Sequence, residues 1–282
     1  MYLFLLIAFL TSFGTLQSVE AEDKTVLLAV LARNKAHVLP YYLHCIDNLD
    51  YDKKKITVYI NTNNNQDNTV ELLRNWIVEK GSEYRGVIYE SHEVEGLLAC
   101  SPHHWTAERF KVLGAIRNRS MEQAVSTKSD FYFVVDCDNF IVPSTLRDLV
   151  VHNKPIIAPM LRAIPDPEDG YSNFFTVVDE QGYWGGVEGY YPILLWEKVG
   201  AFDVPVVHCT YLIQTHVIPE LTYIDASSDH EFVIFSRRAR ERGIGQFICN
   251  EKFYGYVLHP DETITLPEEV EMIHKFMAEA NQ

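Results

Sequence analysis

The sequence of 282 residues lacks the features of several protein classes. It contains no internal repeat, no low-complexity tract and no linker, so most of it is expected to form one large domain. Its strongest basic clusters are Lys53-Lys54-Lys55 and Arg237-Arg238-Ala239-Arg240, while the net charge is −15. A phosphate-backbone ligand such as DNA needs a far more positive surface, so we expect no nucleic acid partner.

Cysteine is scarce and badly spaced for cross-links. Its five copies are an odd number, and the sequence has no CxxC and no Cys/His pair at zinc-finger spacing. These spacings predict neither a disulfide scaffold nor a zinc module. One or two disulfides are still compatible with an oxidising compartment.

The first 21 residues form an apolar run that turns polar and ends in small residues. This pattern predicts a secretory signal cleaved after Ala21, followed by a mature chain of residues 22–282. No Lys or Arg precedes the apolar run, so a single membrane anchor is the alternative. Thr11, Gly14 and Gln17 make the run a poor match to a span of about 20 apolar residues, so we expect no stable membrane span after cleavage.

Apolar strand-like runs alternate with helical patterns through the first half of the chain. Strands are predicted at 25–32, 56–61, 87–89 and 131–135, and helices at 36–49, 70–80 and 107–126. Strand–helix–strand units of this spacing favour a mostly parallel sheet with helices on both faces. The fold class is therefore α/β, with a first half that resembles a nucleotide-binding Rossmann layer.

Two acids follow the last of these strands directly, in the stretch FYFVVDCDNF. Ligands of parallel sheets lie at the carboxyl ends of the strands, and alternation places Asp136 and Asp138 on the same side. Two such carboxylates repel unless a cation or hydrogen-bond donors lie between them, and a hard divalent ion meets that need. In the alternative interpretation, one Asp caps the helix that starts near Pro143 and the other is solvated.

Ordered sequence blocks point to a known family. They are LARNKAHVLPYYL (31–43), NNNQDNT (63–69), HWTAERF (104–110), FYFVVDCDNFI (131–141), KPIIAPML (154–161), YSNFF (171–175), FDVPVVHCTYLI (202–213), SSDHEFVIFS (227–236) and FICNEKFYGYVLHP (247–260). Together they resemble the amino-terminal domain of the collagen hydroxylysine galactosyltransferases of glycosyltransferase family 25. The resemblance implies the GT-A fold and covers nearly the whole mature chain.

The resemblance assigns the two acids to a metal site. Asp136 and Asp138 would hold Mn²⁺ or Mg²⁺ against the diphosphate of a UDP-sugar, where a divalent cation stabilises the charge of the leaving UDP. His259 near the carboxyl end is the candidate third ligand. An exposed loop histidine is the alternative for that residue.

Several polar residues are candidates for binding the donor. Arg33 and Asn34 follow the first strand and Asp67 ends the loop after the second, although Asn and Asp also favour turns without any ligand. The resemblance adds Arg109 and Arg117, on the helix before the two acids. For these two arginines, a solvated helix face is the alternative.

Sugar transfer with inversion needs a general base that takes the proton of the acceptor hydroxyl. Asp229, in the block that matches the family's acidic pair, is the candidate, with Glu231 as the second choice. Asp229 could instead cap the following helix, with Ser227 and Ser228 competing for that role. The family's paired acids appear here as Ser228-Asp229, so only one acid is in register.

A Gly-rich segment, QGYWGGVEGYYPI, predicts an irregular loop that carries Tyr183, Trp184, Tyr190 and Tyr191. Their aromatic faces suit a sugar or an acceptor peptide, and packing in the core is the alternative for each.

The resemblance implies transfer of galactose from UDP-galactose to a hydroxyl, with hydroxylysine of a collagen-like protein as the acceptor. A UDP-glucose-specific or glycan-specific transferase of the same fold is one alternative, and a non-catalytic binding or adhesion protein is another. The expected location is the lumen of the endoplasmic reticulum. For a bacterial source, it would be the periplasm or the exterior.

Overall fold

The computed structural model describes residues 23–94, 106–166, 170–260 and 263–280. The predicted signal at residues 1–21 lies outside them. Within the described ranges no helix is long and apolar enough to cross a bilayer. The cysteines in these ranges, Cys45, Cys137, Cys209 and Cys249, are free thiols.

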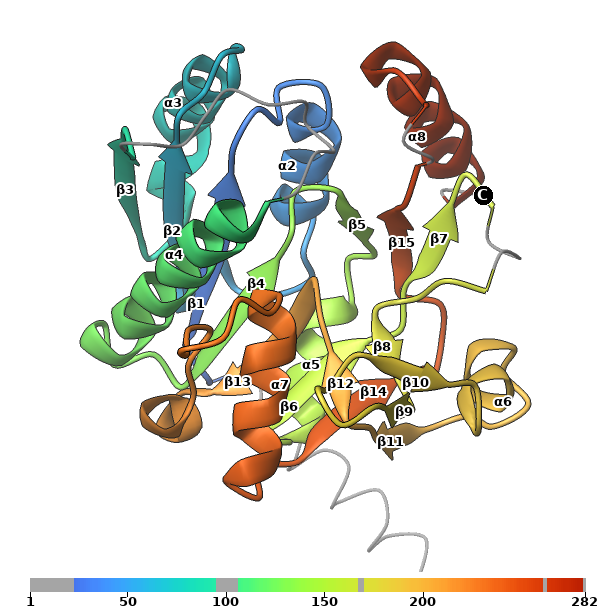
Figure 1. Cartoon of the computed structure of the whole chain (residues 1–282). Coiled ribbons are helices and arrows are strands. Elements are labelled where there is room, and N and C mark those ends of the chain that lie inside the picture. Colours follow the sequence, from blue (N-terminus) through green and yellow to red (C-terminus); the bar gives the residue numbers. More distant parts are fainter. Residues whose placement is uncertain (1–22, 95–105, 167–169, 261–262, 281–282) are drawn as a thin grey trace, which may run out of the picture.

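An eight-stranded sheet forms the centre of the structure, in the order β11-β14-β6-β13-β4-β1-β2-β3 (Figure 1). Its strands are β1 (Val26–Ala32), β2 (Ile56–Asn63), β3 (Gly86–His92), β4 (Phe131–Val135), β6 (Ile156–Pro159), β11 (Ala201–Asp203), β13 (Thr210–Gln214) and β14 (Gln246–Cys249). Strands β1 to β4 are mutually parallel, whereas β13 runs antiparallel between β4 and β6. The sheet is therefore mixed and mostly parallel, as the sequence predicts.

Three smaller sheets accompany it. They pair β10 (Trp184–Gly186) with β9 (Val177–Val178), β12 (Val206–Val207) with β8 (Phe174–Phe175), and β15 (Gly255–Leu258) with both β5 (Asn139–Ile141) and β7 (Arg162–Ile164). Strand β5 begins directly after the two acids. The third sheet therefore holds in place the loop of residues 136–138, which we call the acidic loop. In its register Val257 lies opposite Asn139.

Helices cover both faces of the central sheet (Figure 1). They are α2 (Leu39–Asp47), α3 (Thr69–Lys80), α4 (Ala107–Ser126), α5 (Thr145–His152), α6 (Tyr190–Leu194), α7 (Glu231–Glu241) and α8 (Leu266–Ala280), with 3₁₀ turns η1 (Lys53–Lys55), η2 (Gly81–Glu83) and η3 (Thr215–Glu220). Alternate residues of β1 divide between two cores. Val26, Leu28 and Val30 pack with α2, α3 and α5, whereas Leu27 and Ala29 pack with α4 and α7.

The strands on the two sides of β1 create the position for a site. Strand β2 lies on one side of β1 and β4 on the other. Helix α2, which follows β1, and helix α4, which precedes β4, pack on opposite faces of the sheet, so a crevice opens between the carboxyl ends of β1 and β4. Arg33 follows β1 there, and Asp136 follows β4.

The predicted strands and helices of the first half are confirmed with small shifts. Helix α2 begins at Leu39 and not at Ala36, with Pro40 in its first turn, where its missing N–H costs nothing. The Gly-rich segment differs from the prediction, because it forms β10 and α6. Gly185 makes this pairing possible, since a Cβ at that position would lie 2.6 Å from the backbone carbon of Val178.

Candidate active site

The carboxyl ends of β1 and β4 open into a cavity. Its charged lining consists of Arg33, Lys35, Arg109, Arg117, Asp136 and Asp138. These four cationic and two acidic side chains leave a formal excess of two positive charges. The excess contrasts with the net charge of −15 of the whole chain.

Asp136 is bound by an arginine from α4. Nη2 of Arg117 lies 2.9 Å from each carboxylate oxygen of Asp136, and the arginine side chain is only 4% exposed. Burial raises the pKa of Asp136, and the Arg117 guanidinium opposes that rise. The sequence predicts that Arg117 contacts the donor. In the structure this arginine binds Asp136, one of the two acids.

Glu231, the first residue of α7, lies on the other side of the same arginine. Its Oε1 is 3.4 Å from Nε of Arg117, and burial raises the pKa of its carboxyl. Helices α4 and α7 approach closely at Gly114, where a Cβ would lie 2.8 Å from the carbonyl oxygen of Tyr223 and 3.5 Å from Cβ of Glu231. Asp136, Arg117 and Glu231 thus form a buried ion triad, and we use that name below.

Asp138 pairs with a lysine that the sequence analysis missed. Nζ of Lys35 lies 2.6 Å from Oδ2 of Asp138, and both side chains are about 30% exposed. Burial works to raise the pKa of Asp138, but the Lys35 ammonium outweighs it and the pKa is lowered. Lys35 is two residues beyond Arg33, so the rule that parallel strands end at one edge could have found it.

The acids and His259 come from neighbouring backbone segments. The N–H of Leu258 donates to the carbonyl of Asp138 at 2.9 Å, which places His259 one residue from that contact. The ring of His259 stacks on Tyr171, with centroids 3.7 Å apart. Among the described residues, the ligand atoms of Asp136, Asp138 and His259 do not converge within 4.8 Å.

The donor set nevertheless fits a divalent metal in its chemistry. Two carboxylates at one strand end offer the oxygen ligands that Mn²⁺ and Mg²⁺ prefer. The Lys35 amine that occupies Asp138 is part-exposed and on a flexible stem, so it can leave the carboxylate.

Two of the predicted donor-binding residues line the cavity beside the acids. Arg33 has a buried Nε that finds no hydrogen-bond partner within the described ranges, and a ligand could use this donor. Asn34 has a φ of 52°, and its side chain accepts a hydrogen bond from the N–H of Gln66 at 2.7 Å. The N–H of Asn34 donates in turn to Oδ1 of Asn65. Asn34 therefore joins the loops after β1 and β2 while it faces the cavity.

Asp67 does not line the cavity, so the donor-binding role predicted for it has no support here. Its Oδ2 accepts from the N–H of Ala36 and its Oδ1 from that of Thr69, both at 3.0 Å. With both oxygens used, Asp67 joins the β1 loop to the start of α3. The turn-forming alternative explains this residue, because short acidic side chains bind nearby backbone N–H groups.

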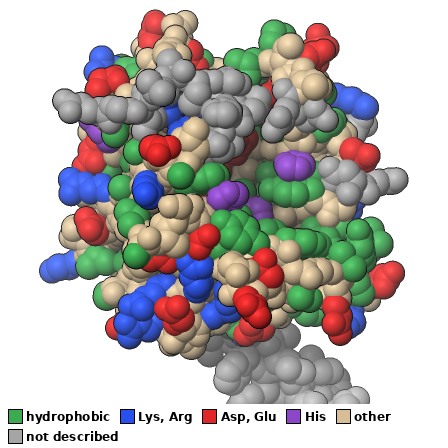
Figure 2. Space-filling view, in the orientation of Figure 1, with side chains coloured by type: hydrophobic (Ala, Val, Ile, Leu, Met, Phe, Trp, Pro, Cys, Tyr) green, Lys and Arg blue, Asp and Glu red, His purple; other side chains and the backbone are tan. Residues whose placement is uncertain are grey.

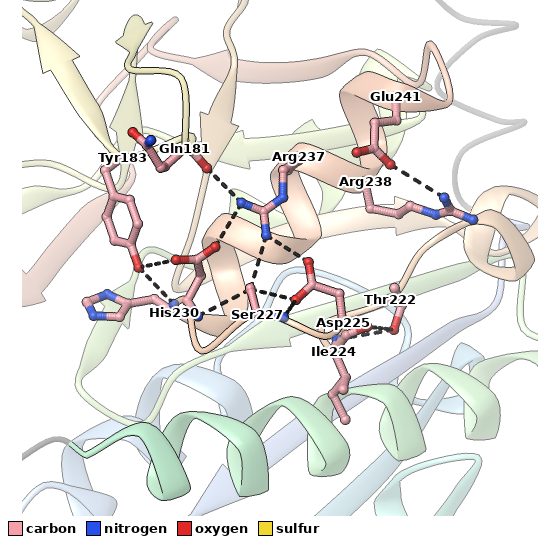
Figure 3. Close-up of polar contacts among 11 residues, drawn as sticks. Gln181, Tyr183, Thr222, Ile224, Asp225, Ser227, His230, Arg237, Arg238 and Glu241 are labelled. Carbon is pink, nitrogen blue, oxygen red and sulfur yellow. Dashed lines mark hydrogen bonds and ion pairs between the residues drawn. The ribbon is translucent and has the colours of Figure 1, made fainter.

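Asp229 belongs to a network of polar contacts around Arg237, and Figure 3 shows Arg237 with Asp225, Ser227 and Gln181. Arg237 donates to Oδ2 of Asp229 at 2.9 Å and to Oδ2 of Asp225 at 2.7 Å, and the Tyr183 hydroxyl donates to Oδ1 of Asp229 at 3.3 Å. Burial works to raise the pKa of Asp229, but the hydrogen bonds from Arg237 and Ser227 dominate and lower it. The carboxylate is therefore ionised. Its side chain is 25% exposed.

A series of stacked and tilted rings runs from the acidic loop to the start of α4. Its members, in order of contact, are His259, Tyr171, His208, Phe232, His230 and Phe110. We call this series the aromatic row; the sequence analysis missed it because its members come from five separate segments. Figure 2 shows histidine side chains among apolar ones near the middle of this face. Burial lowers the pKa of His208 to about 3, so that ring is neutral.

The aromatic residues of the Gly-rich segment separate into two groups. Tyr190 is buried and stacks on Phe174, which supports the core alternative for that residue. Trp184 and Tyr191 are 41% and 45% exposed and remain available to a ligand.

Helix α8 also reaches the cavity. Nε2 of His37, a lining residue, lies 3.0 Å from Oε2 of Glu269, which is 1% exposed. No sequence pattern indicates this pair. Glu269 orients the histidine, so the position of the carboxyl-terminal helix affects the shape of the cavity.

Sequence comparison identifies relatives of the chain. The sequence model described as glycosyltransferase family 25, N-terminal domain, matches residues 23–277. Procollagen galactosyltransferase 2 of Mus musculus is 35% identical over 271 residues, which cover 90% of this chain and 42% of the relative. An inactive glycosyltransferase 25 family member 3 of the same species is 31% identical over 263 residues, or 89% and 44%. The chain therefore spans less than half the length of these relatives.

Solved structures of GT-A glycosyltransferases share the fold. S. aureus TarS 1-349 in complex with UDP-GlcNAc has a TM-score of 0.55 at 14% identity, over 90% of this chain and 66% of that one. The mannosyltransferase PcManGT from Pyrobaculum calidifontis in complex with GDP-Man and Mn²⁺ has a TM-score of 0.50 at 13% identity, over 85% and 58%. The predicted α/β fold of GT-A type is confirmed.

The ion triad predicts a large effect of one substitution on stability. Arg117→Gln leaves the buried carboxylate of Glu231 and the part-exposed carboxylate of Asp136 without a cation, so we expect the free energy of unfolding to fall by about 3 kcal/mol. Arg119→Gln is the matched control, because Arg119 is 54% exposed on the same helix and bonds only Glu90 among the described residues. It should change stability little. Urea unfolding followed by circular dichroism measures both, and similar small losses would contradict the triad.

The Arg237 network predicts a pH dependence of stability. The pKa values of Asp225 and Asp229 are lowered in the folded state. Their ion pairs therefore stabilise the folded state fully above the unfolded pKa of about 3.9. This stabilisation is lost as the pH falls through the folded-state pKa values. Arg237→Gln should cost about 1 kcal/mol near pH 7, since solvent screens these part-exposed groups, and progressively less below about pH 4. Thermal unfolding across pH 3 to 7 tests this. A cost that persists at about pH 3 would show that packing, and not charge, is responsible.

Proposed function

The chain belongs to glycosyltransferase family 25, and from this membership we propose that it is a metal-dependent, inverting glycosyltransferase. It transfers galactose from UDP-galactose to a hydroxyl group, with hydroxylysine of a collagen-like protein as the acceptor. The charge of the cavity carries the proposal. The site keeps an excess of one positive charge even when Glu231, the partner of Arg117, is counted, and such an excess at the strand ends of an acidic chain suits the diphosphate of a nucleotide-sugar.

Asp136 and Asp138 are the residues that would hold Mn²⁺ or Mg²⁺, with His259 as the third ligand. A divalent ion bound there supplies a Lewis acid that stabilises the charge developing on the leaving UDP. Arg117 and Glu231 hold Asp136 at the end of β4, so the carboxylate is oriented before any ligand arrives. With Asp138 holding the metal, the ammonium of Lys35 would be free to pair with the diphosphate.

The other two cationic residues of the lining, Arg33 and Arg109, bind the donor. Arg33 offers a buried N–H without a partner among the described residues, and Arg109 lies in the first turn of α4, where the helix dipole also favours an anion. Asn34 sets the shape of the loop that presents Arg33 and Lys35. These groups are attached to strand and helix ends, which keeps the donor in one position relative to the acids.

Asp229 is the better candidate for the general base. The base must reach the acceptor hydroxyl, and the Asp229 side chain is 25% exposed, whereas Glu231 is sealed between α4 and α7 at 5%. Glu231, the second choice from the sequence, instead positions Arg117. Arg237 and Tyr183 hold the carboxylate of Asp229 from two sides and keep it ionised, ready to accept a proton.

The acceptor has an apolar surface available beside this base. His230 of the aromatic row follows Asp229 directly, and Trp184 contacts Phe175, which packs against Phe232 of the row. Aromatic faces suit the C–H surfaces of sugars and peptides. We assign the acceptor to this side of the cavity.

Membership alone does not decide between active and inactive proteins, because relatives named as either are similar to this chain. Retention of Asp136, Asp138 and Asp229 favours an enzyme over a binding or adhesion protein on the same fold. UDP-glucose and glycan acceptors are the alternatives within the fold. We place the protein in the secretory pathway, in the lumen of the endoplasmic reticulum, with residues 22–282 as its GT-A domain.

We expect UDP binding to require a divalent metal and to be lost in Asp138→Asn, since the diphosphate then faces the remaining charge of Asp136 without a complete metal site. Isothermal titration calorimetry with Mn²⁺ and with EDTA measures this. Asp130→Asn is the control, because Asp130 bonds Thr25 at the opposite edge of the sheet. Equal UDP affinity with and without EDTA would overturn the metal assignment.

Asp229→Asn should retain its fold and its UDP affinity, because this residue contacts the acceptor and not the donor. Galactose transfer should fall by about 10²- to 10⁴-fold, as expected for the loss of a general base. Glu231→Gln, in contrast, should lower both UDP affinity and stability. Transfer assays with a panel of UDP-sugars, combined with calorimetry, separate the two roles. Near-normal turnover in Asp229→Asn would place the base elsewhere.

A further inference from the structure

A second group of ligand-type side chains lies away from the cavity. Cys249 ends β14, His152 ends α5, and Glu251 follows in the loop toward β15. Nε2 of His152 lies 3.4 Å from Sγ of Cys249 and 3.3 Å from Oε2 of Glu251, and the three ligand atoms all lie within 4.8 Å of one another. One thiol, one imidazole and one carboxylate therefore converge on a single point.

These separations match the edges of a tetrahedral zinc site. With Zn–S of about 2.3 Å and Zn–N and Zn–O of about 2.0 to 2.1 Å, a tetrahedral ion sets nitrogen about 3.6 Å from sulfur and about 3.3 Å from oxygen. A hydrogen-bonded chain would give similar distances, so the choice of ligands has to distinguish them. Thiolate and imidazole together select a borderline-soft ion such as Zn²⁺ over Mn²⁺ or Mg²⁺.

Cys249 is buried, and the Tyr254 hydroxyl lies 3.4 Å from its sulfur. Metal binding would displace the thiol proton. Asp148, one turn before His152, is already paired with Lys252 at 2.6 Å, so water would occupy the fourth position.

We propose that Cys249, His152 and Glu251 bind one zinc ion that joins α5 to the end of β14. The bound ion would fix the segment that leads from Cys249 into β15. That strand pairs with β5, directly after the two acids, and the N–H of Leu258 at its end donates to the carbonyl of Asp138. The zinc site is thus structural, and it supports the acidic loop through the third sheet.

Metal analysis of the full chain tests the proposal. We expect about one zinc per chain in purified protein, and a rise in Tm of at least about 3 °C when Zn²⁺ is returned to chelator-treated protein. Co²⁺ in place of zinc should show thiolate-to-cobalt charge-transfer absorption, which a site made only of oxygen and nitrogen ligands cannot produce. Cys249→Ser should abolish that absorption, and Cys45→Ser, which alters another buried cysteine, should leave it intact.

Because Cys249 is buried and its variant could fail to fold, Glu251→Gln provides a second test at a side chain that is 49% exposed. Loss of this ligand should weaken zinc binding at least about 10-fold, since even outer-shell changes weaken metal sites by 10- to 100-fold. Asp138→Asn should keep its zinc, which separates this site from the cavity. Absence of zinc and of charge-transfer absorption, or unchanged affinity in Glu251→Gln, would overturn the proposal.

Discussion

Asp136 and Glu231 share one buried cation, Arg117, and the geometry of the cavity depends on that shared charge. A buried carboxylate is tolerated only when it is paired, and here the buried Glu231 and the part-exposed Asp136 meet a guanidinium that is itself 4% exposed. The arginine comes from α4, one acid from the end of β4 and the other from the start of α7. The two ion pairs of Arg117 therefore fix the distances between these three elements. Gly114 allows helices α4 and α7 to come close enough for this.

Backbone hydrogen bonds anchor the acidic loop at both of its ends. The N–H of Asp136 donates to the carbonyl of Cys209, and the carbonyl of Asp138 accepts from Leu258. The backbone is thus fixed, while the Asp138 side chain remains part-exposed and paired with the flexible Lys35. A loop with a fixed backbone, whose carboxylate can exchange the Lys35 ammonium for another cation, suits the proposed binding of a metal and a diphosphate. The backbone then does not have to rearrange.

Much of the sheet could be predicted from local pattern. Strands β1 and β4 are continuous apolar runs, as expected of strands whose faces are both covered by helices, and such runs are recognisable without a structure. The antiparallel position of β13 was not predicted, since strand direction depends on where the chain returns. The Gly-rich segment was predicted to be an irregular loop, but it contains β10 and α6, because Gly185 permits a close backbone contact that no local pattern reveals.

The sequence by itself determined which residue types lie at the strand ends: Arg33 after β1, and Asp136 and Asp138 after β4. Period-2 alternation and the parallel sheet require this placement. Only the tertiary structure decided the partners, namely Arg117 for Asp136 and Lys35 for Asp138, and the backbone contacts that occupy Asp67. His152 and Cys249 likewise meet across 97 positions of sequence. The reason is physical: periodicity specifies the direction of a side chain within its own element, whereas an ion pair or a ligand set depends on the distance between elements, which packing alone determines.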